Sequence, residues 1–171
     1  VIDVVVIEGN FSQIGVTTST TVVYPPFEGA TINKVIVKQG CTRIPSYCFA
    51  SSDVKSLEFD EAVPDASVDI QDSAFKQCFS LDYVDFHKIK SVSNYSFAYC
   101  GFTSLDLYNL SSTYWYTFAG CTKLTSLNIN NNMVLGSSSF SGDVSLEHIY
   151  GADHITSIQI NAFEGCFKLS G

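Results

Sequence analysis

The segment Ile158-Gln-Ile-Asn-Ala-Phe163-Glu-Gly-Cys166-Phe-Lys-Leu169 carries the pattern that decides the fold. In it, an aliphatic residue and a phenylalanine are separated by four residues, and a cysteine and a leucine then follow at intervals of three. The segment Ile70-Gln-Asp-Ser-Ala-Phe75-Lys-Gln-Cys78-Phe-Ser-Leu81 has the same residue types at the same spacing. Two distant segments that share one register indicate an internal repeat, so further copies are expected along the chain.

Phenylalanine marks this repeat throughout the sequence. Seven phenylalanines occur at intervals of 22, 26, 22, 21, 22 and 23 residues: Phe27, Phe49, Phe75, Phe97, Phe118, Phe140 and Phe163. The residues five positions before them are aliphatic in six copies, with Thr113 as the exception: Val22, Ile44, Ile70, Val92, Leu135 and Ile158. The residue three positions after them is a cysteine in four copies: Cys78, Cys100, Cys121 and Cys166. We expect these phenylalanines and cysteines to form the structural core of the repeat.

A strand is expected after each phenylalanine. Most copies carry an apolar triplet with spacing three and then two, as in Leu124, Leu127 and Ile129. Its last two members alternate with polar residues, as a strand with one buried face requires. Glycine recurs two positions after the phenylalanine, which suggests left-handed backbone there, at Gly29, Gly120, Gly142 and Gly165. No copy can bury its triplet alone, so the pattern predicts a stacked solenoid. An ordinary β-sandwich would not explain the shared register.

The triplets Leu124-Thr-Ser-Leu127-Asn-Ile129 and Phe102-Thr-Ser-Leu105-Asp-Leu107 resemble the strand signature of leucine-rich repeats. Together with the phenylalanine and cysteine positions, they make residues 22–171 similar to the BspA-like leucine-rich repeat family. The resemblance implies a curved β-rich horseshoe with one short strand per repeat of 21–26 residues and turns or 3₁₀ segments on the other side. Only Asn132 stands where the commonest leucine-rich repeats carry their conserved Asn or Cys, so no asparagine ladder is expected.

The two ends of the sequence depart from the repeat. Residues 1–21 are interpreted as a divergent first repeat or an N-terminal edge strand with an enlarged loop, because Ile2, Val5 and Ile7 have the triplet spacing. Such an edge needs a preceding repeat or a cap to cover it. Residues 22–171 are assigned to the BspA-like repeats, and the last copy is expected to be truncated in mid-repeat, after Leu169.

Composition and motifs argue against several classes of function. The chain has 17 acidic and 9 basic residues, and a net charge of −8 repels a phosphate backbone, so no nucleic-acid partner is expected. The longest aliphatic run, residues 4–7, is far shorter than the roughly 20 apolar residues that span a bilayer, so this segment should not insert into membranes. Motifs for phosphate binding, a nucleophilic serine or a zinc protease are absent, so we expect neither an enzyme nor a cofactor.

The cysteines outside the repeat register leave one question open. The four register cysteines are interpreted as small buried hydrophobic residues in preference to disulfide or redox partners. Cys41 and Cys48 lie seven residues apart across a turn that contains Pro45, and a local bridge between them remains an alternative. Three sequons, which alone do not establish secretion, begin at Asn10, Asn94 and Asn109.

The outward positions of the strands form the candidate binding surface. In register, three carboxylates form a ladder with tyrosines beside it. Like charges one strand apart repel each other, so the ladder costs some stability. The functional interpretation is a groove for a basic or polar protein partner, with the tyrosines as rigid anchors. The alternative is that a solvated strand face simply carries polar residues. One acid per strand does not make a calcium loop, so no metal site is expected. The candidate residues are Glu58, Tyr83, Asp85, Asp106, Tyr108, His148 and Tyr150.

These features predict a non-catalytic protein-binding module. A rigid concave surface suits the recognition of macromolecules better than the enclosure of a small substrate. The family resemblance implies a cell-surface or secreted adhesion protein that binds a host matrix or cell-surface protein. The alternative is a cytoplasmic structural or scaffold segment that docks onto a neighbouring subunit of a larger assembly, and buried free cysteines would suit either.

Overall fold

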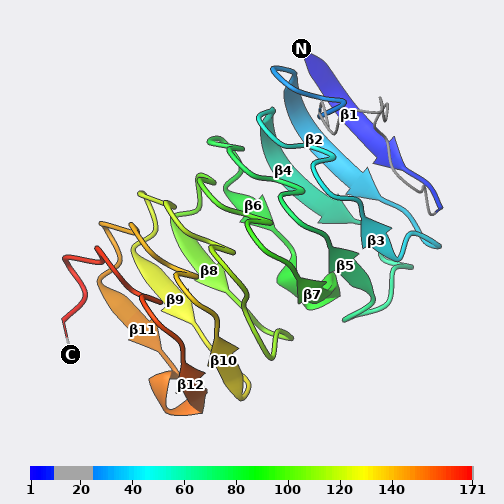
Figure 1. The fold of residues 1–171 in the computed structure, drawn as a ribbon. Coiled ribbons are helices and arrows are strands. Elements are labelled where there is room, and N and C mark those ends of the chain that lie inside the picture. Colours follow the sequence, from blue (N-terminus) through cyan, green and yellow to red (C-terminus); the bar gives the residue numbers. More distant parts are fainter. Residues whose placement is uncertain (10–24, 171) are drawn as a thin grey trace, which may run out of the picture.

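The computed structural model describes residues 1–9 and 25–170. In this part of the chain, the polypeptide winds into a solenoid in which every strand pairing is parallel (Figure 1). One row of strands consists of β1 (Ile2–Ile7), β2 (Thr31–Val37), β4 (Asp53–Phe59), β6 (Tyr83–Val84), β8 (Ser104–Asp106), β9 (Ser126–Asn128) and β11 (His148–Tyr150). The predicted leucine-rich-repeat solenoid is therefore confirmed, and the row that contains the apolar triplets is called the strand face below.

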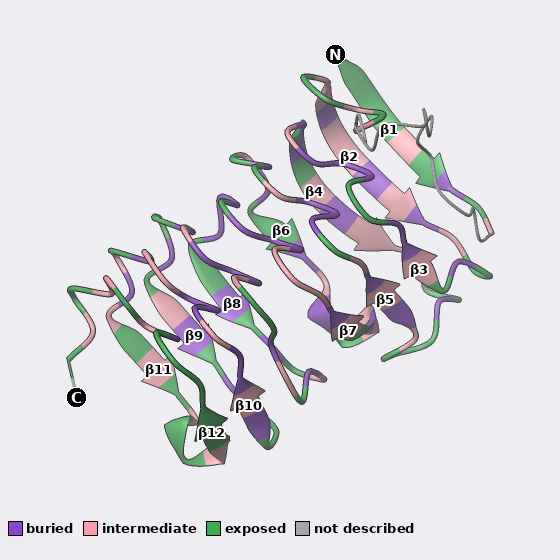
Figure 2. Cartoon of the chain, viewed as in Figure 1, coloured by how far each residue is buried: buried purple, intermediate pink, exposed green. Residues whose placement is uncertain are grey.

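The side opposite the strand face contains more than the turns and 3₁₀ segments that were expected. It carries a second row of short strands: β3 (Arg43–Ile44), β5 (Val68–Ile70), β7 (Ile89–Val92), β10 (Met133–Leu135) and β12 (Ile155–Ile158). Five of the aliphatic residues that stand five positions before a phenylalanine lie in this row, and three of them, Ile44, Ile70 and Leu135, are fully buried. Two 3₁₀ helices, η1 (Phe86–Lys88) and η2 (Ala152–His154), connect the two rows. The core lies between the rows, and β12 at the end of the second row is largely exposed (Figure 2).

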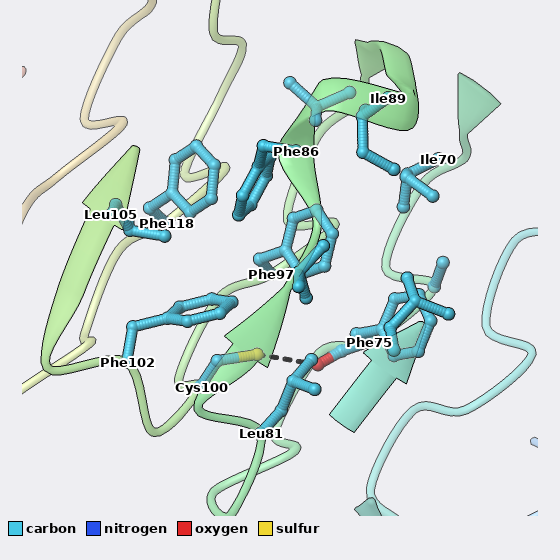
Figure 3. Packing of buried hydrophobic residues seen from close by; sticks show 14 of the residues in the cluster. Ile70, Phe75, Leu81, Phe86, Ile89, Phe97, Cys100, Phe102, Leu105 and Phe118 are labelled. Atoms are coloured by element: carbon cyan, nitrogen blue, oxygen red, sulfur yellow. Dashed lines mark hydrogen bonds between the residues drawn. The ribbon is translucent and has the colours of Figure 1, made fainter. Parts of the chain in front are cut away.

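The seven phenylalanines of the repeat stack in one continuous row through the core. Neighbouring ring centroids lie 4.9 to 5.6 Å apart, with interplanar angles of 3 to 15°. The five inner rings are fully buried, whereas Phe27 and Phe163 at the ends of the row are half-buried. Phe86 packs its edge against this row, 5.5 Å from Phe97 and 5.9 Å from Phe118 (Figure 3).

The phenylalanine turns contain left-handed residues at two positions. The residue two positions after the phenylalanine has positive φ in every copy: Gly29, Ser51, Gln77, Tyr99, Gly120, Gly142 and Gly165. The residue two positions before the phenylalanine also has positive φ in six of the seven copies, as in Tyr95 and Tyr116, and Pro25 is the exception. This geometry aims successive N–H groups at the next turn, so that Phe75 donates to the carbonyl of Ser96 and Phe97 to that of Thr117. The turns are therefore joined by their own hydrogen-bond ladders as well as by the strands.

The register cysteines complete these turns. Each thiol donates to the phenylalanine carbonyl of the preceding turn: Cys78 to Phe49 at 3.1 Å, Cys100 to Phe75 at 3.2 Å, Cys121 to Phe97 at 3.5 Å and Cys166 to Phe140 at 3.1 Å. Figure 3 shows the Cys100 bond. Burial raises the pKa of Cys78 to about 12, and that of Cys100 and Cys121 well above the ordinary thiol value. These positions are therefore neutral, hydrogen-bonded thiols.

The bridge left open by the sequence is absent. All six cysteines of the chain are free, and Cys41 and Cys48 are both buried. Cys41 donates to the carbonyl of Arg43 at 3.3 Å instead of pairing with Cys48. Burial raises the pKa of Cys48 to about 12, so this thiol is unreactive as long as the turn stays folded.

Two asparagines at a position that the sequence comparison did not consider join neighbouring turns. The side chain of Asn109 donates to the carbonyl of His87 at 2.6 Å, and that of Asn131 donates to the carbonyl of Tyr108. These asparagines stand two residues after the last strand position, one residue earlier than the position that the sequence comparison used. They join three consecutive turns at the end of the strand face.

At the N-terminus, β1 pairs with β2 in the register of the triplets. Ile2, Val5 and Ile7 lie opposite Ile32, Val35 and Val37. Most of the enlarged loop predicted for residues 8–21, and the aliphatic position at residue 22, lie outside the described residues.

Candidate binding cleft on the strand face

The strand face is interrupted by a cleft between β6 and β8. Strands β1, β2, β4 and β6 form one sheet, and β8, β9 and β11 form another, without pairing between β6 and β8. A cavity of about 260 Å³ lies at this interruption. Its polar lining is formed by Asp82, Tyr83, Asp85, His87, Ser104 and Asp106, and its apolar lining by Val84, Phe86, Phe102 and Leu105. We call this cavity the β6–β8 cleft.

The cleft opens because the chain leaves the sheet directly after β6. The Asp85 carboxylate accepts the backbone N–H of His87 at 3.1 Å and so caps the short helix η1. The capped 3₁₀ helix follows β6 directly, so residues 86–88 do not continue the strand. Phe86 and Phe102 are consequently packed below the gap, where their rings lie 6.2 Å apart.

Three of the predicted site residues line this cleft. Tyr83 is 54% exposed and comes from β6, Asp85 follows it, and Asp106 ends β8. Asp106 accepts a hydrogen bond from the Asn130 side chain at 2.7 Å, which fixes the orientation of its carboxylate. Asp82 adds a third carboxylate to the lining. The cleft therefore combines negative charge with an exposed aromatic ring.

Tyr108 and His87 form an aromatic pair beside the cleft. Their ring centroids lie 4.2 Å apart, and the Nδ1 atom of His87 lies 3.1 Å from Oδ1 of Asp85. His87 thus connects the predicted residue Tyr108 to the cleft. Tyr108 itself is 45% exposed and so remains available for contact.

The remaining predicted residues lie elsewhere on the strand face. Glu58, on β4, forms an ion pair with Lys34 at 2.9 Å, so its charge is compensated within the protein. His148 and Tyr150, on β11, form a tilted aromatic pair at 6.0 Å. They lie two strands away from β8, about 10 Å by the usual strand spacing. The seven candidates therefore divide into the cleft group, one internal ion pair and a separate aromatic pair.

Sequence reasoning missed the cleft itself and its lining residues Asp82 and Ser104. It assumed an unbroken strand face, in which Asp85 and Asp106 would be neighbours in one ladder. The available signal was the copy that begins at Phe97, in which Gly101 and Phe102 follow Cys100 and the strand starts one residue earlier than in the flanking copies. A Cβ at Gly101 would lie 2.4 Å from the carbonyl oxygen of Phe79, so the backbones of two neighbouring turns are in close contact at this glycine.

The described residues contain neither a metal site nor a membrane-spanning helix. They contain no group of three or more His, Cys, Asp or Glu side chains placed to hold a metal ion. No helix within residues 1–9 and 25–170 has the length and apolar character needed to cross a bilayer. The arrangement at the cleft suits recognition, because it presents oriented carboxylates and aromatic rings on a preformed surface.

Comparison with family models identifies the same repeat. A family model described as a BspA type leucine rich repeat region matches residues 10–67 and 42–170, in six copies. A solved leucine-rich repeat protein from Bacteroides ovatus is similar over 81% of this chain, with 19% sequence identity and a TM-score of 0.47. The chain spans about half of that protein, 48% of its length. A comparison with curated proteins gives no match.

Proposed function

The chain belongs to the BspA-type leucine-rich repeat family, and we propose that it is a non-catalytic binding module that holds a basic segment of a protein partner in the β6–β8 cleft. Leucine-rich repeats generally mediate contacts between proteins. The observation that carries the proposal is the cleft, where Asp82, Asp85 and Asp106 meet the exposed ring of Tyr83. The net charge of −8 favours the approach of a cationic partner over long range.

The aromatic residues of the strand face give this site its anchors. Tyr83 and Tyr108 expose about half of their surface, and a tyrosine side chain loses little conformational entropy on binding. Tyr150, which is 57% exposed, offers a second contact farther along the same face. A partner that extends along the strand face would place a basic side chain in the cleft and apolar groups against Tyr150 and His148.

We assign the module to an adhesion protein at the cell surface or in the secreted fraction. The family resemblance is the support for this assignment, and a host matrix or cell-surface protein is the corresponding partner. The rigid solenoid suits this role, because its binding groups are fixed by the core before the partner arrives.

Charge reversal at the cleft tests the proposal. The double variant Asp85→Lys/Asp106→Lys should weaken binding to immobilised matrix proteins and to a lysine-rich peptide by about tenfold or more, which corresponds to about 1.4 kcal/mol. The variant Asp85→Asn/Asp106→Asn keeps the cap of η1 and the acceptor for Asn130 but removes both charges, so its effect should be intermediate. Surface plasmon resonance at two salt concentrations measures both effects.

A second charge reversal serves as the control. Asp72→Lys/Glu164→Lys changes the net charge equally at two exposed positions outside the cleft. Equal weakening by both double-lysine variants would assign the effect to net charge alone. Unchanged binding of the Asp85→Lys/Asp106→Lys variant, with circular dichroism like that of the wild type, would move the binding site away from the cleft.

The absence of a bridge between Cys41 and Cys48, which lie outside the repeat register, favours a second candidate, an intracellular scaffold segment that docks into a larger assembly. Thiols persist in reducing compartments, and disulfides form in oxidising ones. Intact mass of the protein from its native source, after alkylation under denaturing conditions without reductant, separates the two candidates. Hexose-bearing mass at Asn94 or Asn109 supports the extracellular role, whereas six alkylated thiols without glycan support the scaffold.

A further inference from the structure

A second cavity lies on the side opposite the strand face, where the second row of strands is interrupted. Between β7 and β10, residues 111–116 form no strand, and only an isolated bridge joins Ser112 to Val134. A cavity of about 360 Å³ lies at this interruption. Residues from four consecutive turns line it, including Asn94, Ser112, Val134 and Gln159. We call it the Trp115 pocket.

Two exposed aromatic side chains border the Trp115 pocket. Trp115 is 59% exposed and Tyr114 is 50% exposed, although Thr113 and Thr117 in the same turn are buried. Thr113, immediately before them, is buried and accepts the backbone N–H of Gly136 with its hydroxyl group. The backbone that carries the two rings is thus held in place, while the rings themselves have no described aromatic partner.

Two amide side chains are held so that their donor groups remain available. The Asn94 side-chain oxygen accepts the backbone N–H of Trp115 at 3.1 Å, which leaves its NH₂ group without a partner among the described residues. The Gln159 side-chain oxygen accepts the hydroxyl of Ser137 at 3.1 Å, which leaves its NH₂ group free in the same way. The lining contains no charged side chain among the described residues.

This chemistry selects a neutral, hydroxylated ring with one apolar face. The face of an aromatic ring is negative and attracts polarised C–H groups, whereas amide and hydroxyl groups satisfy hydroxyls at the edge of a ligand. Without a charged group in the lining, an ionic ligand would lose hydration and gain no counter-charge. We propose that the Trp115 pocket binds a hexopyranose ring of a neutral saccharide, stacked on Trp115 or Tyr114 and hydrogen-bonded to Asn94 and Gln159.

Trp115 makes the proposal directly measurable. It is the single tryptophan of the chain, so its fluorescence reports on this pocket alone. The bacterially expressed chain, which carries no glycan at Asn94, is titrated with maltose, cellobiose and diacetylchitobiose, and with the methyl glycoside of each monosaccharide unit. We expect a saturable fluorescence change for at least one of these sugars. Binding of the glycoside indicates recognition of terminal glycan residues, whereas binding of the disaccharide alone indicates a longer site.

Matched variants distinguish a site from a general solvent effect. Asn94→Asp and Gln159→Glu keep the oxygen acceptors that hold Trp115 and Ser137 but remove the free NH₂ donors. Each should weaken the fitted affinity for the sugar at least fivefold without changing the melting temperature by more than about 2 °C. Asp85→Lys/Asp106→Lys should leave the sugar titration unchanged, so that failure of the saccharide site and failure of the β6–β8 cleft are separate results.

Three outcomes would overturn the proposal. One is the absence of a saturable change with every sugar up to 50 mM. Binding that does not saturate by about this concentration is weaker than the millimolar affinities of specific complexes. Another is a change that persists undiminished in both amide variants. The third is saturable binding of a proline-rich peptide, tested in the same assay, without binding of any sugar, because that result would assign the exposed aromatic rings to a protein partner.

Discussion

At Asp143, a carboxyl group stands in the slot that four other copies fill with cysteine. Asp143 is completely buried, and its Oδ1 atom accepts the backbone N–H of Cys121 at 2.8 Å, whereas Oδ2 has no partner. Burial raises the pKa of Asp143 to about 9, although hydrogen bonds from the backbone of Cys121 and Gly120 oppose the shift. The side chain is therefore protonated at neutral pH, and the turn contains a neutral acid among thiols.

The raised pKa of Asp143 predicts how stability depends on pH. The folded protein binds one proton more than the unfolded chain between the ordinary carboxyl pKa near 4 and the folded pKa of about 9, so this residue lowers stability as the pH rises through that window. Asp143→Asn keeps the acceptor for Cys121 and cannot ionise. The free energy of unfolding of Asp143→Asn minus that of the wild type should therefore increase steadily in urea titrations at pH 5, 7 and 8.5. A difference that is constant over this range would contradict a buried, protonated Asp143.

Gly120 is required for a steric reason besides its backbone conformation. Its φ is +72°, and a Cβ added there would lie 2.4 Å from the ring of Tyr99. Gly29 has nearly the same φ, +70°, but no atom of the described residues lies within 4 Å of its added Cβ. Gly29→Ala should therefore lower the free energy of unfolding by about 1 to 2 kcal/mol, the cost of left-handed backbone alone, and Gly120→Ala should lower it further. Equal losses in chemical denaturation would show that the Tyr99 ring moves aside freely.

Among the elements, the row of stacked phenylalanines is the most continuous. Phe118→Ala, in the middle of this row, should lower the free energy of unfolding by about 3 to 5 kcal/mol, because it leaves a cavity between the rings of Phe97 and Phe140. Phe167→Ala is the matched control, since that ring is 86% exposed and its removal should change stability by less than about 0.5 kcal/mol. Urea unfolding measures both changes, and a near-neutral Phe118→Ala would contradict the role of the row as the core.

The elements differ in how far the sequence could predict them. The triplets of β2, β4 and β9 were recognisable because each fills three inward positions and begins five or six residues after a phenylalanine. Strands β3 and β5 were not, because two or three residues give no periodic pattern. The left-handed turns were recognisable at Gly120 but not at Gln77 or Tyr99, where hydrogen bonds to the next turn impose a conformation that those side chains do not favour.

The candidate site was predictable only in its residue types. Acids and tyrosines at outward strand positions could be found by register, and Tyr83, Asp85 and Asp106 do meet at one place. The interruption that brings them together depends on one local choice, the capping of η1 by Asp85, which competes with continued pairing of β6. A repeat pattern describes what copies share, so it cannot reveal a feature made by one copy that differs.

At the scale of the whole molecule, both rows of strands are interrupted between the same two copies, those that begin at Phe75 and Phe97. The strand face breaks between β6 and β8, and the opposite row breaks after β7. The two candidate pockets lie at or beside these breaks, because unpaired backbone and displaced side chains leave space there. The solenoid is nevertheless joined across the break by the Phe75 and Phe97 rings, 5.4 Å apart, and by the hydrogen bond from Phe75 to Ser96.

These connections predict that the chain unfolds as one unit despite the interruption. The fluorescence of Trp115 reports on the C-terminal side of the break, and far-ultraviolet circular dichroism reports on all strands, so their urea midpoints should coincide. Phe86→Ala removes the side chain that packs against Phe97, Phe102 and Phe118, and it should separate the two midpoints because neighbouring turns lose their coupling there. Leu57→Ala, in the middle of β4 and equally buried, should instead shift both midpoints together. Separate midpoints in the wild type would mean that the turns on either side of the β6–β8 cleft fold independently, and the cleft would then be a hinge in place of a fixed surface.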